Sequence, residues 1–206
     1  MKKVRYMGES IKKNQITISY EKITSEYISE FGKESLLILS LLSRRYTIRC
    51  ELTFSLHYLY NQLNIDGRNK VKKDDVIKCI EGMFCIKLEK NINNLIDIPY
   101  QSPKQQYLIL TDEEVDCILN YGGRADIYGL FNTYVSIKRY VNKDTKTSYP
   151  AIIQLMDILN ISSNNTIIKY IKILEDLNMI KCNRSDQYIL VNGKLKKPNN
   201  EYEILM

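Results

Sequence analysis

Apolar residues recur every three or four positions over two neighbouring segments, 150–159 and 164–177. This spacing predicts two amphipathic helices, each with one face in a core. Pro150 suits the first position of the earlier helix, because it lacks only a hydrogen that would go unpaired there. The link between the helices holds one residue that tolerates a tight turn and two hydroxyls that can cap a helix, Asn160, Ser162 and Ser163. The pattern therefore predicts a helix, a short turn and a second helix.

The polar face of the second predicted helix has the chemistry of a DNA contact. At about 100° per residue, Asn165, Lys169 and Lys172 point away from the core, with Asn164 and Ile168 on the flank. Amides and hydroxyls suit base edges and phosphate oxygens, lysine neutralises phosphate, and isoleucine can touch a thymine methyl. We expect this helix to meet DNA through Ser163, Asn164, Asn165, Thr166, Ile168, Lys169 and Lys172.

After Asn178 the hydrophobic period changes from helical to alternating. Segments 179–182 and 187–191 are predicted strands around the turn 183–186. This hairpin would carry Arg184 at its tip, where the guanidinium could touch phosphate or a minor groove.

The run LNISSNNTIIKYIKILEDLNMI resembles the signature of winged helix-turn-helix proteins. In that signature an apolar residue, a turn, a capping Ser and a Thr-apolar start precede a Tyr-Ile-x-x-Leu-Glu helix that exits into the wing. The resemblance implies duplex DNA binding by the second helix. This chain has one extra residue between Ser162 and Thr166, so either Asn165 or Asn164 would take the base-reading position. The alternative is a three-helix unit that only holds proteins together.

Upstream patterns predict further elements in order along the chain. Alternation predicts strands at 14–20 and 46–52, and helical spacing predicts helices at 20–31, ending at Gly32, and at 125–141. The run LLILSLLSRR is apolar on nearly every side, which favours a helix buried within a domain. Thr53 is the expected cap of the helix FSLHYLYNQLN, and Thr111 to Glu114 forms a capping-box pattern. The last segment, GKLKKPNNEYEILM, is a polar tail that we expect to be mobile.

An internal repeat links the two halves of the chain. An offset of 96 residues places Leu59, Leu63, Asn64 and Ile65 on Leu155, Leu159, Asn160 and Ile161. Further on, VIKCI at 76–80 matches IIKYI at 167–171. Segments 85–89, 95–98 and 106–110 would form a larger wing in the first copy.

The two copies differ in charge. Asp74, Lys78 and Glu81 are expected to face outward on the second helix of the first copy, where the carboxylates would repel phosphate. The long turn before that helix is basic and suits DNA-backbone contact, through Arg68, Lys70, Lys72 and Lys73. We therefore expect the first copy to mediate dimerisation or partner contact, and the second to read DNA.

Together these patterns predict an α+β fold, mostly α with small β wings, in the form of two winged-helix domains in tandem. The expected domains are 1–121 and 122–206, with the boundary at Gly122-Gly123. Two small cores are compatible with 206 residues of which 44% are apolar.

Composition narrows the class of function. The net charge of +6 is compatible with an anionic partner. Five scattered cysteines without a C-x-x-C pair and the lone His57 give no zinc pattern, and they suit a reducing cytoplasm. With no glycine-rich phosphate loop, catalytic motif or membrane-length apolar run, we expect no enzyme, cofactor, metal or membrane partner.

Tandem winged helices of unequal charge resemble the replication initiators of plasmids and phages. That resemblance implies double-stranded DNA as the partner, a homodimer through the first domain, and contact with replisome proteins. Two other DNA-binding roles remain open, a transcriptional regulator and a plasmid partition or transfer accessory protein. From a different class, a replisome assembly module would not read DNA at all.

Overall fold

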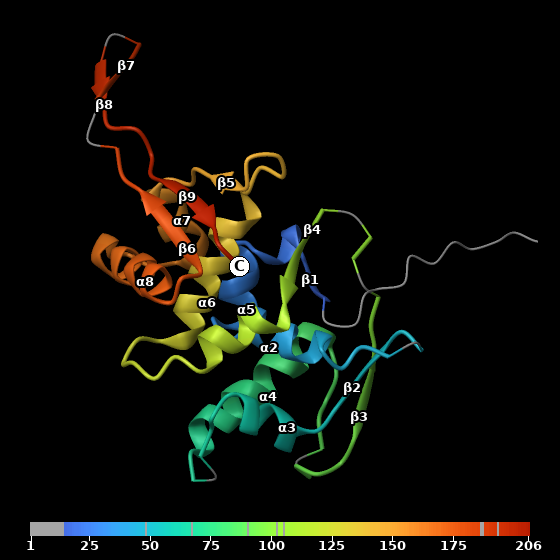
Figure 1. The fold of residues 1–206 in the computed structure, drawn as a ribbon. Helices are drawn as coiled ribbons and strands as arrows, with labels where there is room; N and C mark the ends of the chain where they lie inside the picture. Colours follow the sequence, from blue (N-terminus) through green and yellow to red (C-terminus); the bar gives the residue numbers. More distant parts are fainter. Residues whose placement is uncertain are drawn as a thin grey trace, which may run out of the picture.

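The structure is a computed structural model that describes residues 15–206 except 48, 67, 90, 102, 105, 186, 187 and 193. It confirms an α+β fold of helices and small antiparallel sheets (Figure 1). The helices are α1 Ser25–Phe31, α2 Ser35–Ser43, α3 Leu56–Gln62, α4 Lys70–Phe84, α5 Asp112–Leu119, α6 Ile127–Arg139, α7 Ile152–Leu159 and α8 Asn164–Asp176. The strands are β1 Gln15–Ser19, β2 Glu51–Phe54, β3 Ile96–Pro99, β4 Tyr107–Thr111, β5 Thr147–Ser148, β6 Ile180–Asn183, β7 Ile189–Val191, β8 Lys194–Lys196 and β9 Glu201–Ile204.

Helix α2 lies at the centre of the molecule, as its continuous apolar run predicts. Every residue from Ser35 to Leu42 is buried. The helix packs against α1, α3, α4, α6 and the strands β1 and β2. Its buried Ser40 hydroxyl donates to the Leu36 carbonyl at 2.8 Å, so this polar group needs no outside partner.

Helix α5 is locked to its neighbours by polar contacts. The predicted capping box is confirmed, because Glu114 N–H donates to the Thr111 hydroxyl and Thr111 N–H donates to the Glu114 carboxylate. The fully buried Glu114 carboxylate also accepts from Tyr134 and Lys138 of α6. Burial and the nearby Glu114 carboxylate raise the pKa of Tyr134, so its hydroxyl keeps the proton that it donates.

Several local predictions for the first part of the chain need correction. Ser55, not Thr53, caps α3, because its hydroxyl accepts from Tyr58 N–H at 3.2 Å. In the expected strand 46–52, Tyr46 forms an isolated bridge with Leu52, and the strand β2 begins only at Glu51. The expected helix 20–31 is a short 3₁₀ turn, Tyr20–Lys22, followed by α1, which ends at Gly32 as predicted.

The larger wing expected in the first copy does not form as predicted. Strand β4 pairs with β1 and not with β3, whereas β3 pairs with β2. Segment 86–89 forms no strand. Local alternation identifies the strands, but the choice of partner depends on residues far away along the chain.

The second wing also differs from its prediction. Strand β6 pairs with β9, and β7 pairs with β8, so segments 179–182 and 187–191 do not form one hairpin. The tail expected to be mobile supplies the central strand of the sheet β5-β9-β6. Tyr202 of this strand is fully buried, which ties the tail into the core.

The backbone confirms the repeat at the offset of 96 residues. Asn64 and Asn160 both adopt the left-handed conformation, with φ of 50° and 52°. Ile65 N–H donates to Tyr60 C=O at 2.9 Å, and Ile161 N–H donates to Met156 C=O at 3.0 Å. The turns between α3 and α4 and between α7 and α8 thus begin in the same way.

The repeat extends to the strands beside these helices. Cys50 and Lys146, again 96 residues apart, both have positive φ, of 60° and 56°. Each lies next to a strand, β2 or β5, that pairs antiparallel with a strand from the end of its copy, β3 or β9. The copies share one continuous hydrophobic cluster, to which α2 and α6 both contribute.

Replacing a central side chain of α2 should destabilise the whole molecule. We expect Ile38→Ala to lower the free energy of unfolding by about 2–5 kcal/mol, through lost burial and the cavity left behind. Urea unfolding followed by circular dichroism measures this change. The matched control is Val71→Ala on α4, where the side chain is 71% exposed and the change should stay below about 1 kcal/mol. Equal losses in both variants would contradict the central role of α2.

Candidate nucleic-acid interface

Helix α8 has one buried face and one exposed face, as its sequence predicts. Its buried residues are Ile167, Tyr170, Ile171, Ile173 and Leu174. The exposed face carries two amides, two lysines and one apolar side chain, namely Asn164, Asn165, Ile168, Lys169 and Lys172. Ile168 keeps 45% of its surface exposed although it lies beside a core face. The seven predicted contact residues begin at Ser163, the residue before α8, and of the seven only Thr166 is half-buried.

The amino-terminal end of α8 is open. Ser163 occupies the cap position, but its side chain makes no capping hydrogen bond, contrary to expectation. Its carbonyl accepts from Thr166 N–H at 3.1 Å instead. Within the described part of the chain, the first-turn N–H groups therefore have no side-chain acceptor. Such groups, at the positive end of the helix dipole, are suited to a phosphate.

Contacts on the other side of α8 hold it in place. The Asn160 amide donates to Ser25 C=O at 3.1 Å and to the Ser29 hydroxyl at 2.7 Å, which ties the turn to α1. Helix α8 also packs closely on α6 at Gly129, where an added Cβ would overlap the Tyr170 ring. These contacts fix the direction in which the polar face points.

Both asparagines of the first turn are exposed, and they belong to neighbouring rows. Asn165 continues into Lys169 and Lys172, whereas Asn164 continues into Ile168. One row is thus cationic and the other is apolar. Both amides are accessible to a ligand.

Arg184 does not lie at a wing tip, and this prediction was wrong. It follows β6 directly, and its guanidinium pairs with Glu175 of α8 at 2.7 Å. Hydrogen bonding to Glu175 raises the pKa of Arg184. Glu175 also accepts from Cys182 N–H at 3.1 Å, so it joins the end of α8 to β6. Asp186, at the other end of the predicted turn, lies outside the described residues.

The projecting hairpin is β7–β8, which the prediction missed. Figure 1 shows it extending well away from the body of the molecule. Its exposed side chains include Tyr188, Leu190 and Leu195, each at least 65% exposed. The missed signal was the Asn192-Gly193 dipeptide between ILV and KLK, which is a strong short-range hairpin pattern.

In the first copy, the basic residues lie on a helix and not in a long turn as predicted. Lys70, Lys72 and Lys73 form the first turn of α4, and only Arg68 precedes it. Asn69 caps this helix by accepting from Lys72 N–H at 3.1 Å. Arg68, Lys70 and Lys72 are exposed, whereas the Lys73 ammonium lies 5.2 Å from the centroid of the Tyr60 ring. Cations at this end of a helix are unfavourable without an anion nearby.

Further along α4, only part of the face that was expected to point outward is exposed. Lys78 is exposed and Asp74 is half-buried. Glu81 turns toward its own chain, because its carboxylate accepts from Leu88 N–H at 2.8 Å. This carboxylate resembles Glu175 of α8, which also accepts from the N–H seven residues ahead.

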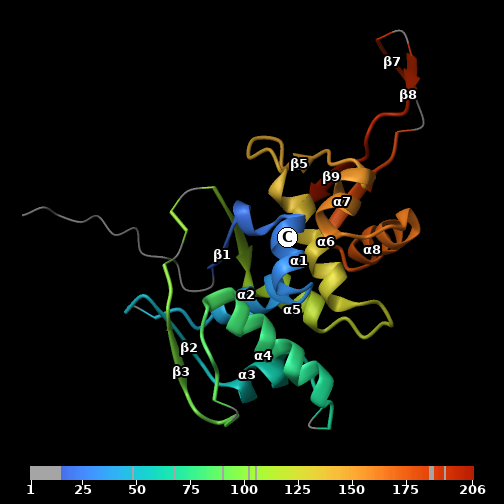
Figure 2. The ribbon, with the colours of Figure 1, turned by 180° about the vertical axis from the view of Figure 1, so that it is seen from behind.

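Three of these features lie toward one side of the molecule. Figures 1 and 2 show α8, the β7–β8 hairpin and the start of α4 on the same side, left in Figure 1 and right in Figure 2. The helix that carries the exposed lysines and amides therefore lies on the same side of the molecule as the projecting hairpin.

Comparison of the chain with protein-family models, with curated proteins and with solved structures finds no match. In the described part of the chain, no helix is long and apolar enough to cross a membrane.

The pair between Arg184 and Glu175 should contribute little to stability. The two side chains are 49% and 25% exposed, and water screens such pairs. We expect Arg184→Ala to lower the free energy of unfolding by less than about 1 kcal/mol, as measured by urea unfolding. Glu175→Ala should cost more, because it also leaves Cys182 N–H without its acceptor. A larger loss from Arg184→Ala than from Glu175→Ala would contradict this assignment.

Proposed function

We propose that the chain is a sequence-specific double-stranded DNA-binding protein built from two winged-helix units. In this proposal α8 enters the major groove and the β7–β8 hairpin is the wing of the second unit. The observation that carries it is the exposed row of Asn165, Lys169 and Lys172, opposite a face of α8 that is fully buried. An amide and two ammonium groups on one rigid helix can meet a base edge and two phosphates at once.

The first unit has a lesser role in this proposal. Arg68, Lys70 and Lys72 would contact the phosphate backbone, because they are exposed at the start of α4 on the same side as α8. Asp74 makes the middle of α4 less suited to a groove than the middle of α8.

Among DNA-binding roles, we propose replication initiation at a plasmid or phage origin. This role is supported by the presence of two similar units in one chain that differ in charge. Footprinting on the DNA that neighbours the gene distinguishes this role from the others. Direct repeats favour an initiator, whereas a single inverted repeat beside a promoter favours a repressor.

The lysines of α8 provide the first test. A duplex is selected from a random library with the full chain, and its affinity is measured by fluorescence anisotropy over a salt series. We expect a dissociation constant of about 10–100 nM at moderate salt. Lys169→Ala with Lys172→Ala should reduce the slope of affinity against salt by roughly two units, because each phosphate contact contributes about one. Charge reversal at both positions should weaken binding more than tenfold.

The matched control is Lys78→Ala on α4, which should change neither affinity nor slope appreciably. Equal losses in the two sets would mean that both helices enter grooves. Failure to enrich any duplex would contradict DNA reading and favour an assembly module.

The asparagines provide the second test, which separates reading from positioning. Asn165→Ala should cost about 1–3 kcal/mol on the selected duplex and little on a scrambled one, because a lost pair with adenine affects only the correct base. Asn164→Ala should cost less on the selected duplex. If the discrimination disappears in Asn164→Ala instead, the row of Asn164 and Ile168 faces the bases.

A further inference from the structure

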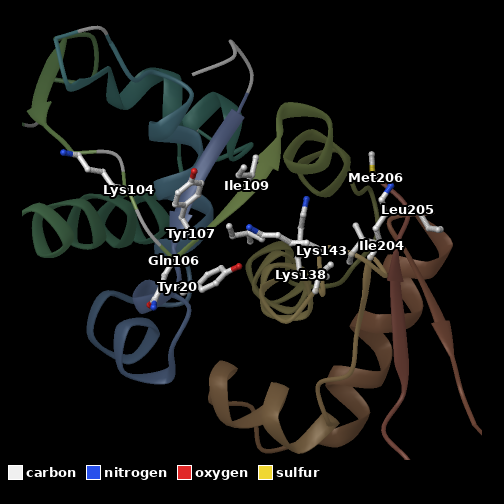
Figure 3. Close-up of a pocket in the computed structure, with 13 residues that line it drawn as sticks. Tyr20, Lys104, Gln106, Tyr107, Ile109, Lys138, Lys143, Ile204, Leu205 and Met206 are labelled. Carbon is white, nitrogen blue, oxygen red and sulfur yellow. The ribbon is translucent and has the colours of Figure 1, made fainter. Parts of the chain in front are cut away.

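A groove separate from α8 and the β7–β8 hairpin lies between β4, the end of α6 and the end of the chain (Figure 3). It encloses about 820 Å³. We call it the lysine groove, after three of its residues, Lys104, Lys143 and Lys146. Its walls also include the apolar residues Ile109, Val141, Leu205 and Met206.

The three lysines give the groove a positive charge that the described residues do not neutralise. All three are exposed, and no ion pair joins any of them to a described carboxylate. Lys138 also lines the groove, but its ammonium is paired with the buried Glu114. In Figure 3 Lys138 and Lys143 lie between the β4 residues and Ile204–Met206.

The edge of β4 supplies a second feature. Strand β4 pairs only with β1 in the described sheets. Tyr20 N–H donates to Gln106 C=O at 2.8 Å. This bond shows which residues of β4 direct their backbone groups toward β1. Since antiparallel pairing alternates along a strand, Leu108 and Leu110 bond toward β1, whereas Tyr107 and Ile109 direct their N–H and C=O groups away from it.

These outward groups have no partner among the described residues. No backbone hydrogen bond joins Tyr107 or Ile109 to a third strand. Four consecutive residues, 106–109, line the groove, so the free edge runs along it. The side chain of Ile109 is 40% exposed there.

We propose that the lysine groove binds an extended acidic peptide of a partner protein, which adds to β4 as a third strand. Its backbone would pair with the N–H and C=O groups of Tyr107 and Ile109. Its carboxylates would meet Lys104, Lys143 and Lys146, and its alternate apolar side chains would cover Ile109 and Leu205. The site is independent of the proposed DNA surface.

Two other occupants fit less well. Phosphodiester groups accept hydrogen bonds but do not donate them, so the phosphates of a nucleic acid leave the carbonyl groups of Tyr107 and Ile109 unpaired. A second copy of the chain joined through β4 would bring two sets of lysines face to face, which is unfavourable.

The binding experiment uses the full chain and a labelled ten-residue peptide in which Glu alternates with Val. We expect saturable binding by fluorescence anisotropy, no binding of the peptide in which Lys replaces Glu, and none of a ten-nucleotide single-stranded thymidine oligomer. Lys143→Glu with Lys146→Glu should weaken peptide binding at least tenfold. The matched control, Lys169→Glu with Lys172→Glu on α8, should bind the peptide as the unaltered chain does.

Amide hydrogen exchange followed by NMR tests the strand pairing itself. The amides of Tyr107 and Ile109 should exchange quickly in the free chain and slow at least tenfold with peptide, while those of Leu108 and Leu110 should be slow in both states. Unchanged exchange at Tyr107 and Ile109 in the bound state would overturn strand addition. Absence of peptide binding, lysine-dependent binding of the oligomer, or self-association that competes with the peptide would overturn the proposal. Duplex affinity is measured in a separate experiment, so a failure to bind duplex DNA does not change how the peptide experiment is interpreted.

Discussion

Helix α2 has no exposed side, and this constraint determines how the rest of the molecule is arranged. A helix that is apolar all round must be covered on every side. Segments from both copies of the repeat supply that cover, including α4 from the first copy and α6 from the second. The copies therefore share one core. Since α6 also carries the closely packed α8, the position of the exposed lysines depends on the burial of α2.

A second constraint acts at the turns. Asn64 and Asn160 adopt a left-handed conformation that asparagine tolerates better than most residues. In both turns the N–H group of the following isoleucine donates a hydrogen bond to a carbonyl group of the preceding helix. The second turn is further fixed by the Asn160 side chain, which bonds to α1. Among the described residues, no side-chain hydrogen bond joins Asn64 to another element, and the turn that follows Asn64 is the longer one.

Local features of this fold could be predicted from sequence because they depend on residues close together along the chain. The period of α8 predicted its buried face, the capping box of α5 is set within four residues, and the repeat predicted that Asn64-Ile65 corresponds to Asn160-Ile161. The strand partners could not be predicted in this way. Strand β6 pairs with β9 from the end of the chain, and Arg184 is held by Glu175 of α8, so both depend on long-range folding. The β7–β8 hairpin is different, because its Asn192-Gly193 signal was local and was overlooked.

The two sets of exposed lysines differ in what surrounds them, and this difference separates their ligands. Lys169 and Lys172 lie on a helix whose backbone groups are bonded within it, so only side chains and the open first turn are available to a ligand. These groups are mainly donors, which suits phosphates and base edges. Lys143 and Lys146 lie beside a strand edge that offers both N–H and C=O groups. A ligand there must both donate and accept, as a peptide backbone does. Lysine content alone would assign both surfaces to nucleic acid, whereas the neighbouring backbone favours a peptide in the groove.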